Sequence, residues 1–198
     1  MLNIAIKTQN EFYKLGLLKI IEKTTNSNEY ILNSIDEECK SNISEHSNVI
    51  FTDLGANVNI FENNPKEGED TYPYPQATIH ITFHADGLFL EEISALISRV
   101  ISLSKMNYKQ LVRSEYFRKM MSRNNTQLST KENHVLMLMG QGHNTNYISK
   151  ILNCSQSTIY SHRRNAIKKL GMINRLQFYK YTLLLKDFCY RENFFLNL

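Results

Sequence analysis

The chain has 198 residues, and its hydrophobic content of 42% is enough for packed cores, which excludes wholesale disorder. Its net charge of +4 is divided unevenly, because residues 1–104 carry 7 basic and 15 acidic side chains and residues 105–198 carry 16 basic and 4 acidic ones. This division predicts two domains and a polyanionic partner for the second.

The cysteines and the N-terminal residues indicate the cellular compartment in which the protein is expected. Cys39, Cys154 and Cys189 are odd in number and share no metal-ligand spacing, so we expect free thiols in a reducing cytoplasm. The first residues lack a basic leader followed by an apolar stretch, and no window approaches the ~20 apolar residues of a membrane helix. We therefore expect a cytoplasmic protein that has no membrane partner and no cofactor.

Residues 1–104 alternate short apolar runs with helical patterns. Strands are predicted at residues 2–6, 30–35, 49–51 and 77–83, and helices at residues 11–22, 34–44 and 88–103, with Phe12, Leu15, Leu18 and Ile21 on one face of the first helix. Residues 62–75 hold all three prolines and an acidic cluster, which predicts a loop. The alternation of strands and helices indicates a parallel sheet in an α/β domain.

Polar side chains alternate along the last of these strands. His80, Thr82 and His84 point to one side of it, where they could sense pH or bind a metal. The simpler interpretation is the solvent-facing side of an edge strand.

A segment rich in Lys, Arg and Asn, residues 105–127, joins the halves, and its part from Tyr108 to Met121 has helical propensity. The predicted organisation is therefore an α/β domain at residues 1–104, a partly helical linker at 105–127, and an all-α domain with a C-terminal tail at 128–198.

The second domain opens with Ser129 and Glu132 in a capping box, which satisfies free amides at a helix start. The apolar run 135–139 follows and ends at the helix terminator 140–142. A second short helix fits residues 144–152. A third fits residues 155–170, with Ser155 as its N-cap. Two short helices and a tight turn before a basic third helix predict a helix-turn-helix, which places the third helix in the DNA major groove.

The third helix has two faces. Its buried stripe is Ile159, Ala166, Ile167 and Leu170, and its outward stripe is Ser157, Ser161, Arg164 and Lys168, with Tyr160 beside them. Arg164 can contact guanine through two hydrogen bonds, whereas Lys168 and Lys169 better suit phosphates. The alternative is an ordinary solvated face. Cys154 and His162 fit no zinc spacing, so packing roles are favoured over a metal site.

These residues resemble the LuxR/FixJ-type helix-turn-helix of bacterial transcription regulators. The matching positions are Leu128, Glu132, Val135, Leu136, Gly142, Ile148, Leu152, Ser155, Thr158, Ile159, His162, Ile167, Lys169 and Leu170. The resemblance implies base contacts for Tyr160, Ser161 and Arg164. It places Thr158, Asn165, Lys168 and Lys169 near phosphates. Ser155 and Ser157 at the start of the helix complete the residues expected to bind DNA.

The same resemblance implies a fourth helix, from Asn174 to about Asp187, that commonly dimerises. Its dimer face would comprise Leu176, Tyr179, Lys180 and Leu183. The alternative for this helix is packing against the first helix of the domain, and Leu183 could serve both contacts.

The first half resembles a shortened response-regulator receiver, in which Asp53 stands at the position of the phosphoacceptor. Receivers hold Mg²⁺ with an acidic pair after the first strand, but this chain has Lys7, Thr8 and Gln9 there. No lysine occurs between Lys66 and Lys105 to partner a phosphoryl group. We therefore expect no phosphorylation switch, and a turn role for Asp53.

The expected function is that of a DNA-binding bacterial transcription regulator, independent of phosphorylation. It would bind promoter DNA as a homodimer, or as a heterodimer with another LuxR-type response regulator, with RNA polymerase as a possible partner. In this expected mode of action the chain resembles auxiliary regulators of the Rcs type, whose receivers cannot be phosphorylated. A ligand-sensing regulator and a protein-interaction antagonist are the alternatives. An enzyme is disfavoured, because no Gly-rich phosphate loop, nucleophile elbow or carboxylate pair is visible.

Overall fold

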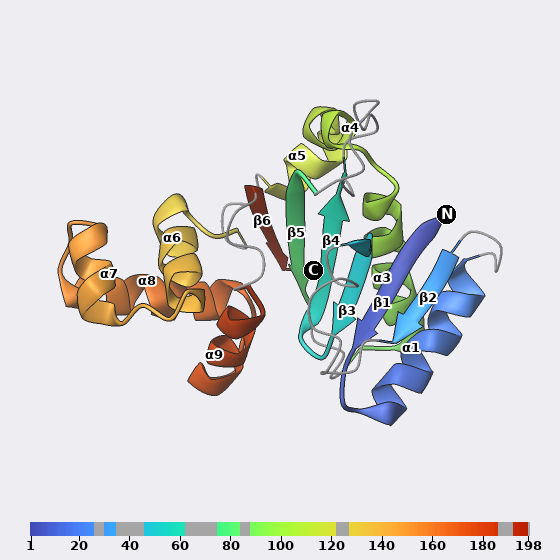
Figure 1. Cartoon of the computed structure of the whole chain (residues 1–198), viewed down its shortest axis with the longest axis horizontal. Coiled ribbons are helices and arrows are strands. Elements are labelled where there is room, and N and C mark those ends of the chain that lie inside the picture. The colour runs from blue at the N-terminus through green and yellow to red at the C-terminus, as the bar shows by residue number, and fades with distance from the viewer. Residues whose placement is uncertain are drawn as a thin grey trace. The chain divides into compact units, whose positions relative to one another are not determined.

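The computed structural model describes residues 1–25, 30–34, 46–61, 75–83, 88–121, 127–185 and 192–197 (Figure 1). The chain divides into two compact units. The N-terminal unit comprises Met1–Arg118 with Arg191–Phe194 and Leu198, and the helical unit comprises Lys119–Tyr190 with Phe195–Asn197. The boundary at residue 104, predicted from charge, and the boundary at residue 128, predicted from the helix-turn-helix pattern, stay predictions.

The N-terminal unit is built on a sheet of order β2-β1-β3-β4-β5-β6. Its elements are β1 (Leu2–Lys7), α1 (Glu11–Thr24), β2 (Tyr30–Ser34), β3 (Val49–Thr52), β4 (Gly55–Ile60), β5 (Ala77–Thr82), α3 (Leu90–Ser104) and α4 (Tyr108–Arg113). The first parts of α5 (Glu115–Met121) and of β6 (Glu192–Asn197) also belong to it, whereas their last three residues belong to the helical unit. Strand β1 pairs in parallel with β2 and β3, with Ile4 opposite Val49, whereas β4 is antiparallel to both β3 and β5. The expected parallel sheet is therefore present in β2-β1-β3 and gives way to a meander.

Helices α1 and α3 lie against one another, and α3 also lies against β3 and β4 (Figure 1). Their inward side chains include Leu17, Ile21 and Ile97, all of which are buried. Phe12 and Leu15, which the helical pattern placed on the same face as Ile21, are instead 89% and 55% exposed. That part of the predicted pattern is wrong, because the buried stripe of α1 is set by Leu17 and Ile21.

A tight hairpin follows β3 and joins it to β4, a strand that the sequence did not predict. Thr52 pairs with Gly55 across the turn that contains Asp53, so the turn role predicted for Asp53 is confirmed. Gly55 has φ +147°, and a Cβ there would lie 1.9 Å from the carbonyl oxygen of Ile81. Glycine is required at this position because both the backbone angle and the close approach exclude a side chain.

Strands β4 and β5 bury polar side chains opposite one another. Asn57 faces His80, and Asn59 faces Thr78, whose hydroxyl donates to Oδ1 of Asn59 at 3.0 Å. His80 and Thr82 are 0% and 1% exposed, so their predicted place on a solvent-facing edge is wrong. Strand β5 lies between β4 and β6 and is covered on both edges. His84 lies outside the described residues.

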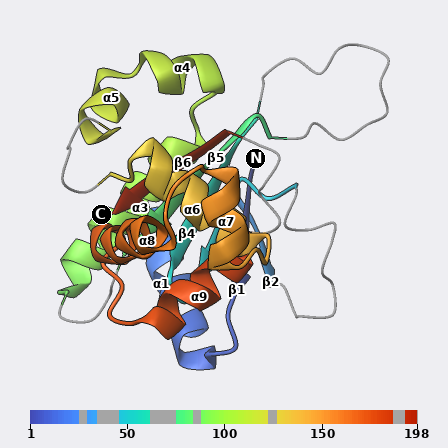
Figure 2. The ribbon, with the colours of Figure 1, turned by 90° about the vertical axis from the view of Figure 1, so that its left-hand side faces the viewer.

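The helical unit contains α6 (Thr130–Gly140), α7 (Thr145–Ile151), α8 (Gln156–Lys169) and α9 (Arg175–Leu184) (Figure 2). Every one of these helices begins at a residue whose side chain accepts a backbone N–H, namely Ser129, Asn144, Ser155 and Asn174. Helix α6 ends before Gly142, which has φ +86°. The predicted combination of an α/β domain and a four-helix domain is confirmed.

The connector and the C-terminal tail were also predicted from the sequence. The connector forms two helices, α4 and α5, separated by Ser114 in an extended conformation. The C-terminal tail, expected to extend the helical domain, contains strand β6 of the N-terminal sheet. The helix predicted at residues 34–44 and most of the loop at 62–75 lie outside the described residues. No helix in the described part of the chain is long and apolar enough to cross a membrane.

Candidate nucleic-acid interface

Helix α8 is capped and anchored as its sequence predicts. The hydroxyl of Ser155 accepts the backbone N–H of Thr158 at 3.1 Å. Ile159, Ala166 and Leu170 are buried, and Ile167 is half-buried. With these apolar side chains inward, the opposite side of α8 is left for solvent or a partner.

A tight turn fixes α8 against α7. Asn153 adopts the left-handed conformation, with φ +49°, and the backbone N–H of Cys154 donates to the carbonyl of Ser149 at 3.0 Å. Ile148 of α7 and Ile159 of α8 meet Val135 of α6 in one buried cluster. Helices α6 and α7 therefore fix α8 through one shared core.

The outward side of α8 is polar, basic and exposed. The predicted base and phosphate contacts that the structure leaves exposed are Ser155, Ser157, Thr158, Tyr160, Ser161, Arg164, Asn165 and Lys168. Helix α8 contains four basic residues and no acidic one. A surface of this kind offers hydrogen bonds to base edges and positive charge to phosphates.

Arg163 belongs to this surface and was missed from the sequence. Its guanidinium carbon lies 4.9 Å from the ring centroid of Tyr160, within the range of a cation–π contact. The stacked guanidinium restrains the Tyr160 ring, which is 46% exposed. Spacing of i, i+3 on a helix was the available signal for this pair.

Lys169 differs from the other basic residues of α8. Its Nζ donates to Oε2 of Glu132 at 2.7 Å, and Glu132 is 3% exposed. The same carboxylate oxygen accepts the backbone N–H of Ser129 at 2.7 Å. The carboxyl's burial raises its pKa, but its bonds to Lys169 and Ser129 outweigh burial and lower the pKa of Glu132 below its ordinary value. The phosphate contact predicted for Lys169 thus competes with an internal partner.

Helix α9 packs on α6 with one face and leaves the other open. Phe178, Tyr181 and Thr182 are buried. A Cβ on Gly140 of α6 would lie 2.6 Å from the carbonyl oxygen of Thr182, so glycine permits the close approach of the two helices. The residues predicted to form a dimer face are all exposed, namely Leu176, Tyr179, Lys180 and Leu183. The two alternatives for α9 therefore use opposite faces of one helix.

Residues 126–182 match the family model of bacterial regulatory proteins of the luxR family. The matched segment begins just before α6, includes α7 and α8, and ends within α9. This segment, 57 of the chain's 198 residues, is the part that is similar to the luxR family, and we call it the luxR-family domain. The family is described as one of bacterial regulatory proteins.

Three solved structures are similar to the chain that carries this luxR-family domain. RcsB from Salmonella enterica serovar Typhimurium bound to promoter rprA is 18% identical, with 92% of this chain and 99% of that chain covered and a TM-score of 0.37. The structure of two RcsB dimers bound to two parallel DNAs is 18% identical, with 93% of this chain and 98% of that chain covered and a TM-score of 0.32. Full-length FixJ from B. japonicum is 13% identical, with 91% of this chain and 95% of that chain covered and a TM-score of 0.32. No curated protein matches the chain.

Outside the luxR-family domain, the position of Asp53 has its own chemistry. The hydroxyl of Thr8 donates to Oδ1 of Asp53, and the phenol of Tyr13 donates to the carbonyl oxygen of Thr52 at 3.1 Å. Burial, followed by the charge of Asp53, raises the pKa of Tyr13 to about 12, so its phenol keeps its proton. The Asp53 carboxylate therefore accepts from a neutral hydroxyl, and a protonated phenol lies on the neighbouring Thr52.

The structure does not support a metal site at the residues considered for one in the sequence. Within the part of the chain that the structure describes, no group of three or more His, Cys, Asp and Glu side chains could hold a metal ion. Cys154 packs against the cluster around Ile148, and His162 is half-buried on α8.

Proposed function

We propose that the protein is a sequence-specific transcription regulator that inserts α8 of its luxR-family domain into the major groove. Base contacts come from Tyr160, Ser161 and Arg164. Phosphate contacts come from Ser155, Ser157, Thr158, Asn165 and Lys168. The observation that carries this proposal is the rigidly held, exposed stripe of α8, which has basic and hydrogen-bonding side chains and no acidic one.

The proposed assembly is a dimer on two half-sites. Apolar side chains at positions 176, 179 and 183 follow a helical spacing on α9, and all of them are about half exposed or more. An exposed apolar stripe rimmed by polar residues is typical of a self-association surface. A dimer would place two α8 helices about one turn of DNA apart, roughly 34–36 Å. A homodimer and a heterodimer with another LuxR-type regulator both use this face.

The proposed control is independent of phosphorylation. Asp53 lies in a two-residue turn and accepts from Thr8, and Lys7, Thr8 and Gln9 supply no second carboxylate for Mg²⁺. Without such a pair, the metal that neutralises a transferred phosphoryl group has few ligands. Regulation would then act through the abundance of the protein or through a partner.

Selection of bound duplexes from a random pool by the full-length protein tests the proposal. We expect enrichment of a sequence with two related half-sites. Recovery of duplexes with no shared sequence, at an affinity set only by salt, would contradict base reading by α8.

A further inference from the structure

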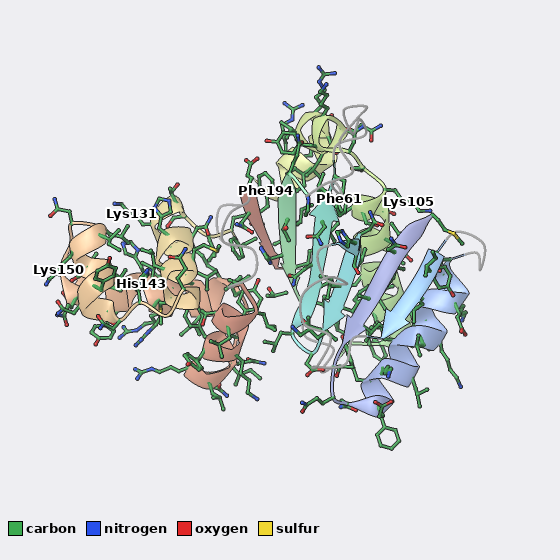
Figure 3. All side chains as sticks on the ribbon, viewed as in Figure 1. Phe61, Lys105, Lys131, His143, Lys150 and Phe194 are labelled. Atoms are coloured by element: carbon green, nitrogen blue, oxygen red, sulfur yellow. The ribbon has the colours of Figure 1, made fainter. Side chains whose placement is uncertain are left out.

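Strand β6 brings the end of the chain back to the N-terminal sheet. It lies beside β5, and Arg191–Phe194 belong to the N-terminal unit although the helical unit precedes them in sequence. Figure 3 shows Phe194 on β6 next to β5. Lys119–Tyr190 of the helical unit are therefore inserted between two segments of the N-terminal unit, Met1–Arg118 and Arg191–Phe194.

His80 joins β6 to the interior of the sheet. Its Nδ1 lies 2.9 Å from Oδ1 of Asn57 on β4, and its Nε2 lies 2.7 Å from Oδ1 of Asn193 on β6. His80 is 0% exposed. Removal of the Asn193 amide would take a hydrogen-bond partner from a buried ring nitrogen, which is costly in the absence of water.

The residues on either side of Asn193 are bound by two further elements. The phenol of Tyr108 on α4 donates to Oε2 of Glu192 at 2.5 Å. The ring of Phe117 on α5, which is 3% exposed, meets the ring of Phe194 edge to face at 5.3 Å between centroids. Three successive residues of β6 thus contact three different elements of the N-terminal unit.

We propose that β5, α4 and α5 form a strand-acceptor site whose ligand is the chain's own Glu192–Phe194 segment, and whose occupancy attaches the helical unit at both of its ends. Addition of a strand to an open sheet edge gains main-chain hydrogen bonds, while side-chain pockets select the sequence. His80, Tyr108 and Phe117 supply that selection. Release of the segment would leave the helical unit attached through α5 alone and uncover the edge of β5.

The test opens the site in the full-length chain by changing its ligand. The double variant Asn193→Ala/Phe194→Ala alters β6 and leaves His80, Tyr108 and Phe117 intact. We expect amide hydrogens of β5 to exchange on the order of tenfold faster, because a buried hydrogen bond and a ring contact are lost. NMR relaxation should also report faster tumbling of α6–α9 relative to β1–β4.

Two control variants separate the site from general loosening. Lys109→Ala changes an exposed side chain on α4 beside Tyr108 and should alter neither readout. Tyr108→Phe removes only the phenol that donates to Glu192 and should give a smaller rise in β5 exchange than the double variant, with the fold retained.

A synthetic peptide of residues 191–198 completes the test when added to the double variant. The peptide of native sequence should restore slow exchange in β5, and the same peptide with both alanines should not. Unchanged β5 exchange in the double variant, or restoration by both peptides, would overturn the acceptor site. Faster β5 exchange without faster tumbling would overturn the two-ended attachment. A wild-type dimer that dissociates in the double variant would place the strand in a second copy and overturn its occupancy within one chain.

Discussion

Nζ of Lys169, on the last turn of α8, donates to Oε2 of Glu132 in the first turn of α6 at 2.7 Å. The carboxylate is nearly inaccessible, and it also closes the capping box with Ser129. This ion pair fixes the end of the proposed DNA-reading helix to the start of the domain. It distinguishes the two adjacent lysines of α8, because Lys168 is exposed whereas Lys169 is half-buried and paired with Glu132.

Lys169→Ala should therefore act on stability rather than on phosphate contacts. Loss of the ammonium leaves Glu132 buried without its cation, at a cost of about 2 kcal/mol in the free energy of unfolding. Urea denaturation followed by circular dichroism measures this change, with Lys168→Ala as the matched control of unchanged stability. For DNA binding, Lys168→Ala should reduce the salt slope by about one unit. A reduced slope for folded Lys169→Ala would show that Lys169 does contact a phosphate.

The same ion pair predicts an acid-sensitive helical unit. The pKa of Glu132 is lower in the folded protein than its ordinary value of 4.5, so the unfolded chain takes up this proton first. The stabilisation is present above pH 4.5 and is lost as the pH falls through the lowered folded value. Thermal melts between pH 6 and about 3 should show a steeper loss for wild type than for Glu132→Gln. Equal slopes would remove Glu132 from the acid response.

Helix α9 should carry the dimer contact on its exposed face. Leu176→Asp or Leu183→Asp places a charge in an apolar interface and should weaken the dimer about tenfold or more. Both side chains are exposed, so circular dichroism should show unchanged helix content. Sedimentation velocity measures the dimer. Full dimerisation of both variants would assign α9 to packing on α6 alone.

Asp53 should have no role in activation. Asp53→Ala removes the bond from Thr8 in an exposed turn and should leave DNA affinity unchanged. Intact-mass measurement after incubation with acetyl phosphate and Mg²⁺ should detect no phosphorylated protein. A phosphoryl adduct present in wild type and absent in Asp53→Ala would contradict phosphorylation independence.

The helical unit was predictable because its signals are local. Ser129, Asn144, Ser155 and Asn174 each cap a helix within three residues of their own position. Strand β4 was missed because Asn57 and Asn59 give it a polar face, and their partners His80 and Thr78 lie about twenty residues away. Such partners are set by the sheet and not by the neighbouring sequence.

Long-range partners also explain the other omissions. Asn193 of β6 lies 113 residues from His80, and Lys169 lies 37 residues from Glu132. The sequence assigned Lys169, together with Lys168, to phosphate contacts, but only the packing of α6 against α8 brings its ammonium to a carboxylate.

The central claim is that α8 reads bases, and the ratio of affinities for a selected duplex and a scrambled duplex tests it most directly. Fluorescence anisotropy at one fixed salt concentration gives both affinities for wild type and for Arg164→Ala. We expect the ratio to fall roughly 5- to 150-fold in the variant, or ~1–3 kcal/mol, with the scrambled duplex bound almost as before. An equal loss of affinity for both duplexes would contradict the claim, because Arg164 would then contact only phosphates.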